Sequence, residues 1–103
     1  MRIAIDANPI FLSRGGIGKY AHHLVQHLVR IDTENAYYLY NTATREREAE
    51  GLRLGERAQI VCFPRAFSSW RARRDRIDVY HGTSYKLRAK GRFGSVVTVH
   101  DLA

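Results

Sequence analysis

The sequence predicts an α/β protein in which an open parallel sheet carries helices on both faces. Three observations lead there. Short, nearly continuous apolar runs recur along the chain, segments with helical spacing separate them, and glycine, proline or polar residues end each run. Strands that alternate with helices in this way form parallel sheets. The expected strands are residues 2–6, 36–41, 58–63, 77–81 and 95–99.

The first strand is followed by a break at Pro9, by three glycines and by the clearest helix of the chain. From residue 17 to 31 the apolar side chains recur at i, i+3, i+4 and i+7, which places them on one helix face. They are Ile17, Tyr20, Ala21, Leu24, Val25, Leu28, Val29 and Ile31.

The other predicted strands differ in composition, but all of them are short. Residues 36–41 are rich in tyrosine, 58–63 end before Pro64, and 95–99 are β-branched. Residues 45–50 carry charges of both signs, which predicts a solvated helical turn or loop.

Composition limits the function classes. The 103 residues suffice for one domain, and 45% hydrophobic with 26% charged residues is typical of a globular protein. Seventeen Lys and Arg against ten Asp and Glu give a net charge of +7, which favours anionic partners. Cys62 has no second cysteine with which to pair, and no run is long enough for a membrane span or a secretion signal. We therefore expect a cytoplasmic protein.

Gly15, Gly16 and Gly18 stand where a helix begins, and this suggests contact with a phosphate. The first turn of a helix offers backbone N–H groups and a positive dipole end to an anion. The spacing is neither the dinucleotide fingerprint nor a P-loop. The alternative is that the glycines only permit a tight turn and close helix packing; we adopt phosphate contact as the working hypothesis.

Three segments are expected to meet beyond the carboxyl ends of the strands, where open sheets bind ligands. They are residues 6–18, 81–85 and 100–101. His100 ends the fifth strand beside Asp101, so its imidazole could donate a hydrogen bond, carry a proton or stabilise charge. A purely structural histidine is the alternative.

Two other groups of residues are given a simpler interpretation. His23 and His27 have the spacing of a metal-binding pair, but with His22 they lie opposite the apolar stripe, and no further ligand stands nearby in sequence. We expect a solvated face and no metal. The tyrosines of residues 37–40 alternate between faces, and no RNA-binding signature is present, so nucleic acid is not expected as a partner.

Residues 65–76 are the most basic segment, and residues 66–76 within it are expected to be helical. Their arginines surround Phe67 and Trp70. The segment could lie on an anionic membrane surface with Trp70 at the interface, or its aromatic side chains could pack onto the sheet. We favour the packed arrangement.

Four motifs, in this order along the chain, resemble the amino-terminal region of GT-B glycosyltransferases of family 4. They are Arg2-Ile-Ala-Ile-Asp-Ala-Asn-Pro, Gly15-Gly-Ile-Gly18-Lys-Tyr20, Asp78-Val-Tyr-His-Gly82 and Val97-Thr-Val-His-Asp-Leu102. The resemblance spans the chain and implies a Rossmann-like domain that, with a second such domain, encloses a cleft. It implies retaining transfer of a sugar from a nucleotide-sugar to a lipid-linked or polysaccharide acceptor, without metal or cofactor.

The resemblance also implies roles for individual residues. His100 would lie near the transferred sugar as the catalytic histidine, and Gly15, Gly16 and Gly18 would approach the donor diphosphate or an acceptor phosphate. The acceptor-side cleft would be bordered by Asn8, His81, Tyr85 and Asp101.

In this interpretation residues 1–103 are the first part of the acceptor-side domain, and the nucleotide is held by a carboxy-terminal domain through a basic pair and a Glu-x7-Glu element. We expect the chain to be inactive alone, to lie at the inner face of the cell membrane, and to self-associate through its exposed sheet. The alternative is a stand-alone Rossmann-like module that binds a nucleotide or phosphate.

Overall fold

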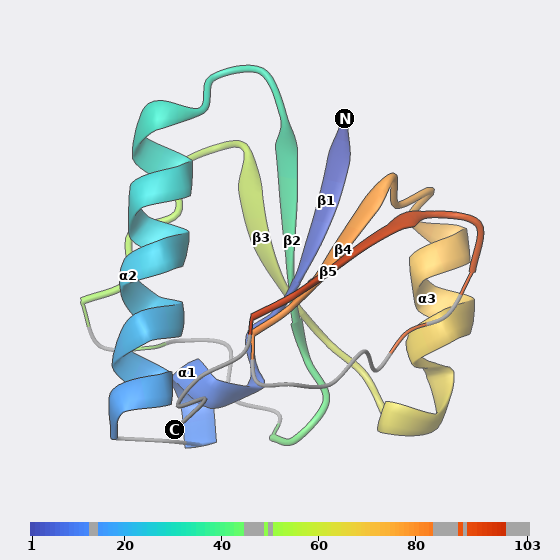
Figure 1. Cartoon of the computed structure of the whole chain (residues 1–103), viewed down its shortest axis with the longest axis horizontal. Helices are drawn as coiled ribbons and strands as arrows, with labels where there is room; N and C mark the ends of the chain where they lie inside the picture. Colours follow the sequence, from blue (N-terminus) through green and yellow to red (C-terminus); the bar gives the residue numbers. More distant parts are fainter. Residues whose placement is uncertain (13–14, 45–48, 50, 84–88, 90, 99–103) are drawn as a thin grey trace.

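A five-stranded parallel sheet forms the centre of the protein (Figure 1). The computed structural model describes residues 1–12, 15–44, 49, 51–83, 89 and 91–98. Among these, the strand order is β3-β2-β1-β4-β5, and every neighbouring pair is parallel. The strands are β1 (Arg2–Asp6), β2 (Ala36–Asn41), β3 (Ala58–Cys62), β4 (Val79–Gly82) and β5 (Gly94–Val97).

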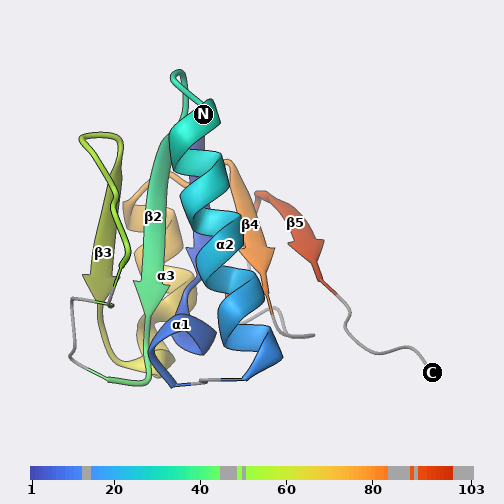
Figure 2. The same ribbon diagram turned by 90° about the vertical axis from the view of Figure 1, so that its left-hand side faces the viewer.

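Helices cover both faces of this sheet. The short α1 (Asn8–Leu12) and the long α2 (Gly16–Ile31) lie on one face, and the 3-10 turn η1 (Arg65–Phe67) leads into α3 (Ser68–Arg74) on the other. Figure 2, turned by 90°, shows α2 in front of the sheet and α3 behind it. The predicted α/β class and Rossmann-like open parallel sheet are therefore confirmed.

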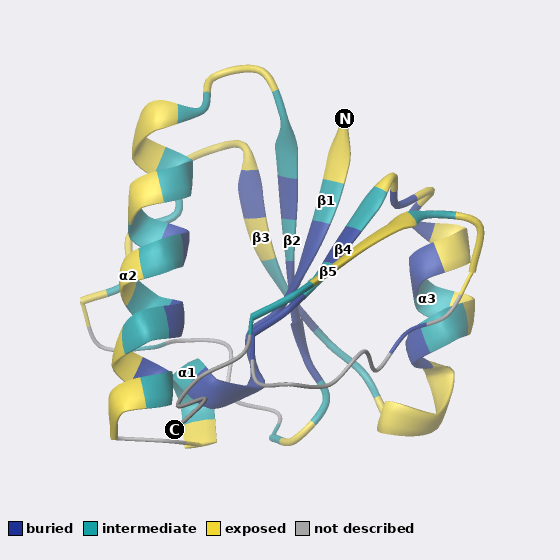
Figure 3. Ribbon diagram, viewed as in Figure 1, coloured by how far each residue is buried: buried dark blue, intermediate teal, exposed yellow. Residues whose placement is uncertain are grey.

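The core consists of two apolar layers, because successive side chains of a strand point to opposite faces. In β1, Ile5 packs under α2 with Val25, whereas Ala4 packs under α3 with Ala72. The colouring in Figure 3 shows the inner side of α2 and the middle of the central strands as buried. Full burial of side chains such as Val25 contributes about 1.5–3 kcal/mol each.

A buried polar cluster fixes α3 to the sheet. The Tyr40 hydroxyl donates a 2.6 Å hydrogen bond to Asp75 Oδ2, and Arg71 Nε donates to the same oxygen at 3.0 Å. The Arg2 guanidinium donates to the carbonyl oxygen of Asp75 at 2.9 Å. Burial and the bond to Asp75 raise the pKa of Tyr40, so its hydroxyl stays protonated.

The first strand ends at Asp6, as the break predicted at Pro9 requires, and Pro9 itself lies in the first turn of α1, where a missing N–H costs nothing. The Asp6 carboxylate accepts the N–H of Asn8 at 3.1 Å just where that helix begins. Ile31, assigned to the apolar face of α2, is 72% exposed, because it lies in the last turn of the helix.

The packed arrangement expected for the aromatic residues of 65–76 is also wrong. Ser68 and Ala72 are the buried residues of α3, whereas Phe67 and Trp70 are 52% and 53% exposed. Small side chains on the inner face let α3 approach the sheet closely and leave both rings outside. The predicted turn or loop at 45–50 lies mostly outside the described residues.

Candidate functional site

The strand order places a topological switch point at the carboxyl ends of β1 and β4. From β1 the chain proceeds outward to β2 and β3, then returns to form β4 on the other side of β1. Such a reversal is where open α/β sheets bind ligands, because the loops that follow the two strands diverge. The ends of the two strands are joined by Thr83, whose buried hydroxyl donates to the Asp6 carbonyl oxygen at 2.6 Å.

Three side chains, from α2, from β4 and from the residue after β5, meet near this switch point. The Thr98 hydroxyl lies 2.6 Å from His81 Nε2 and 3.0 Å from the Tyr20 hydroxyl. Thr98 follows β5, and its N–H donates to the Gly82 carbonyl oxygen at 2.8 Å, which continues the β4–β5 ladder by one residue. This Tyr20–Thr98–His81 cluster links the amino-terminal part of α2 to the ends of β4 and β5.

His81 is partly buried, and burial lowers its pKa below the usual 6.5 because the charged imidazolium loses hydration. The ring is therefore neutral at physiological pH. Because its Nε2 contacts the Thr98 hydroxyl, the imidazole is held in place and acts as a neutral hydrogen-bonding group rather than as a cation.

The start of α2 faces the same edge of the sheet. Its N-cap, Gly15, has an extended backbone and makes no side-chain capping bond, and its carbonyl oxygen accepts the N–H of Lys19 at 3.1 Å. The first turn contains no acidic residue. Helix geometry gives the N–H groups of this turn no intrahelical acceptor, so they and the exposed Lys19 present positive potential.

Gly16 and Gly18 differ in their surroundings. A Cβ built at Gly16 meets no described atom within 4 Å, and the φ of Gly16 is not in the left-handed region. Among the described residues, neither a strained turn nor close packing therefore requires glycine at this position, and the space beside the first turn of α2 is open. Gly18 is buried within α2, as the packing alternative predicts.

The structure gives Asn8 a role that the sequence does not predict. Its side-chain oxygen accepts the N–H groups of Thr42 and Ala43 at 2.7 and 3.2 Å, and its Nδ2 donates to the Thr42 hydroxyl at 3.0 Å. Asn8 is 4% exposed, and its side chain is directed at the loop after β2, which it fixes. Its expected place beside an acceptor stays a prediction.

Of the other predicted site residues, Gly15, Gly16 and Gly18 lie at the start of α2, and His81 lies at the end of β4. His100, Asp101 and Tyr85 are outside the described residues. The cluster brings the glycine start of α2 and His81 to one edge of the sheet, as expected.

Sequence reasoning missed Tyr20, Thr98 and Thr83. Tyr20 was assigned to the apolar face of α2, and Thr98 was counted as one of the β-branched residues of the last strand. The register of β4 and β5 is what identifies Thr98. Gly82 pairs with Val97, so the residues that follow them leave the sheet at the same edge.

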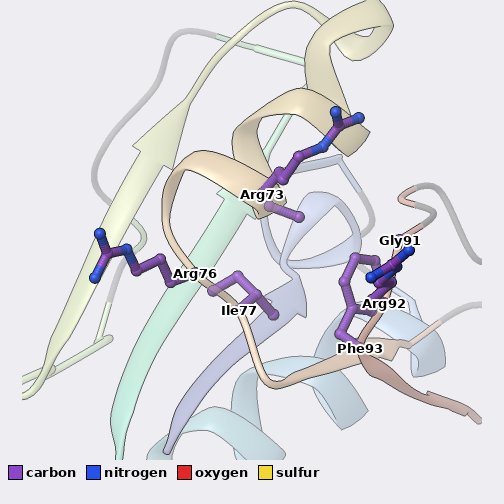
Figure 4. A pocket seen from close by; sticks show the side chains of 7 residues that line it. Arg73, Arg76, Ile77, Gly91, Arg92 and Phe93 are labelled. Atoms are coloured by element: carbon purple, nitrogen blue, oxygen red, sulfur yellow. The ribbon is translucent and has the colours of Figure 1, made fainter.

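The remaining candidates lie elsewhere. His22 and His23 form an edge-to-face ring pair with centroids 5.9 Å apart, and within the described ranges no three His, Cys, Asp or Glu side chains are placed to hold a metal. A cavity of about 380 Å³ lies at the amino ends of β4 and β5, at the other edge of the sheet from the Tyr20–Thr98–His81 cluster (Figure 4). Over the same described ranges, no helix has the length and apolar content needed to cross a membrane.

Comparison with known proteins supplies no relative: no family model, curated protein or solved structure matches the chain.

Proposed function

We propose that the chain forms the acceptor-side wall of a retaining glycosyltransferase, which moves a sugar from a nucleotide-sugar to a lipid-linked or polysaccharide acceptor. The observation that carries the proposal is the Tyr20–Thr98–His81 cluster, because it joins the glycine start of α2 to the ends of β4 and β5. Residues from three of the four motifs of the family resemblance thereby lie side by side near the switch point of the sheet.

The arrangement suits the chemistry of sugar transfer. In that reaction the bond from the anomeric carbon to the diphosphate oxygen breaks, a bond to the acceptor oxygen forms, and the acceptor hydroxyl loses its proton. Negative charge grows on the departing diphosphate, and the N–H groups at the start of α2, with Lys19, would stabilise it. Gly16 leaves room for a phosphate to approach these N–H groups.

The neutral His81 and the Thr98 hydroxyl offer hydrogen-bonding atoms of the kind that hold sugar hydroxyls. Neither is charged at physiological pH, so both can orient an uncharged glycan without competing for the phosphate. By resemblance, His100 and Asp101 would complete this wall next to the transferred sugar, and Tyr85 would border the acceptor.

The proposal assigns the nucleotide base and ribose to a second Rossmann-like domain, so residues 1–103 alone should not turn over. Transfer requires donor and acceptor to be held together away from water. Incubating the purified chain with UDP-sugars, GDP-sugars and a glycan acceptor should yield no transfer product. Appreciable transfer by the chain alone would contradict this division of roles.

A second candidate, a stand-alone nucleotide or phosphate-binding module, is favoured by the open space at Gly16 alone. It predicts saturable, micromolar binding of UDP, GDP or ADP in calorimetry, which Gly16→Val would weaken. The glycosyltransferase proposal predicts weak binding of each free nucleotide. Micromolar binding of a free nucleotide by the wild-type chain would therefore favour the stand-alone module over the glycosyltransferase.

A further inference from the structure

The outer side of α3 and η1 carries exposed aromatic rings and unpaired cations. Phe67 and Trp70 make an edge-to-face contact with ring centroids 6.3 Å apart, and the Arg74 guanidinium lies 5.5 Å from the centre of the Trp70 ring. These three residues follow at intervals of three and four, so they form one stripe. Large aromatic side chains half exposed to water cost free energy unless a partner covers them.

The charge around this stripe is strongly positive. Four exposed arginines surround it, and in the described chain none of their side chains forms an ion pair. The nearby acidic groups are already engaged: Asp75 is buried against Arg71 and Tyr40, and Asp78 accepts the N–H of Arg2 at 2.8 Å. The surface is therefore electrostatically complementary to an anionic partner. The four are Arg65, Arg73, Arg74 and Arg76.

The neighbouring cavity has an apolar interior and a cationic rim. Arg73, Arg76 and Arg92 line it together with Ile77 and Phe93. Figure 4 shows the guanidinium groups of Arg73 and Arg76 pointing away in different directions. Because the guanidinium groups of Arg73 and Arg76 point apart, they cannot hold one compact anion together, whereas the separate phosphates of an extended surface can contact each of them.

We propose that this α3 surface, comprising Phe67, Trp70 and the four exposed arginines, docks onto an anionic phospholipid membrane. The rings would enter the interfacial region and the guanidinium groups would contact lipid phosphates. A single-stranded nucleic acid fits less well, because Arg74 covers one face of the indole on which a base would stack.

Docking by this surface leaves the candidate site accessible. The α3 surface is on the face of the sheet opposite α2, and the Tyr20–Thr98–His81 cluster is on the α2 side at the carboxyl edge (Figures 1 and 2). The inference does not depend on the proposed function, since vesicle binding requires neither sugar nor nucleotide.

The test uses Trp70, the one tryptophan of the chain, as its own reporter. Vesicles containing phosphatidylglycerol should shift its emission to shorter wavelength and reduce quenching by acrylamide, whereas phosphatidylcholine vesicles should not. Raising the ionic strength from about 0.1 M to about 1 M shortens the Debye length from about 10 Å to about 3 Å and should reverse the shift.

Two matched pairs of variants locate the contact. Arg65→Gln with Arg73→Gln should weaken vesicle partitioning about 30-fold, at roughly fivefold per arginine. Arg30→Gln with Arg57→Gln removes the same charge from exposed positions outside the α3 surface and should change it little. Phe67→Ala should weaken partitioning by about tenfold, and Ile31→Ala, at an exposed apolar residue of α2, should not.

Three results would overturn the proposal. They are an unchanged Trp70 emission with anionic vesicles, equal losses in the two arginine pairs, and a response to single-stranded RNA without one to vesicles. Failure here would leave the proposed glycosyltransferase role intact, because that role is tested by transfer and nucleotide binding.

Discussion

Replacing Thr98 by valine tests whether the Tyr20–Thr98–His81 cluster holds the candidate site together. Valine keeps the shape of threonine but removes the hydroxyl that lies 2.6 Å from His81 Nε2 and 3.0 Å from the Tyr20 hydroxyl. Each hydrogen bond contributes about 0.5–1.5 kcal/mol net, and both partners keep some access to water, so the loss should be about 1–2 kcal/mol. For a domain of this size the melting temperature should fall by roughly 4–16 °C.

Thermal and urea unfolding, followed by circular dichroism, measure this loss. Thr33→Val is the matched control, because Thr33 is exposed in the turn after α2, and its effect should stay within about 0.5 kcal/mol. Equal stability of Thr98→Val and the wild type would refute the cluster as a structural link between α2 and the ends of β4 and β5.

Four further predictions follow from other parts of the structure. Gly16→Ala should leave stability unchanged or raise it by up to about 1 kcal/mol in urea unfolding, since its Cβ meets open space; a clear loss would contradict the open helix start. Tyr40→Phe should cost about 1.5–3 kcal/mol, because Asp75 loses a buried charge-assisted bond, and a change below about 0.5 kcal/mol would be inconsistent with this. Burial lowers the pKa of His81, so the folded state binds fewer protons there than the unfolded state, and the free energy of unfolding should fall as the pH drops below about 6.5. His81→Gln should make this fall with pH less steep. An unchanged pH dependence of stability would argue against a neutral buried imidazole. Val96→Lys, on the exposed edge strand β5, should reduce self-association in light scattering, whereas equal association would locate the contact elsewhere.

The sequence was sufficient to predict the fold because its signals were local and repeated. Apolar runs buried on both faces predict parallel strands, and the strand at 36–41 has the predicted bounds. The position of Phe67 and Trp70 was not predictable in this way, since composition does not tell which side of a short helix faces the sheet. Ser68 and Ala72 decide it, because small residues permit close approach.

The candidate site was predictable only in part. Glycines before a helix and a histidine after a strand are visible in sequence, and the topology of a parallel sheet brings them to one edge. Tyr20 and Thr98 were not found, because their contact joins positions 78 residues apart and depends on strand register. The contact of Asn8 with the loop after β2 was not predictable, because a polar residue after a strand can fix a neighbouring loop as well as face a ligand.

The most direct test of the proposed site is an amide NMR titration of the chain with a nucleotide-sugar and, separately, with a glycosyl phosphate. Shifts should concentrate on the N–H groups of Gly16, Ile17 and Gly18 and on those of Gly82 and Thr98, and Gly16→Val should weaken them. Shifts confined to the cavity around Ile77 and Phe93, or no shift at millimolar ligand, would contradict the assignment of this edge of the sheet as a sugar-phosphate site.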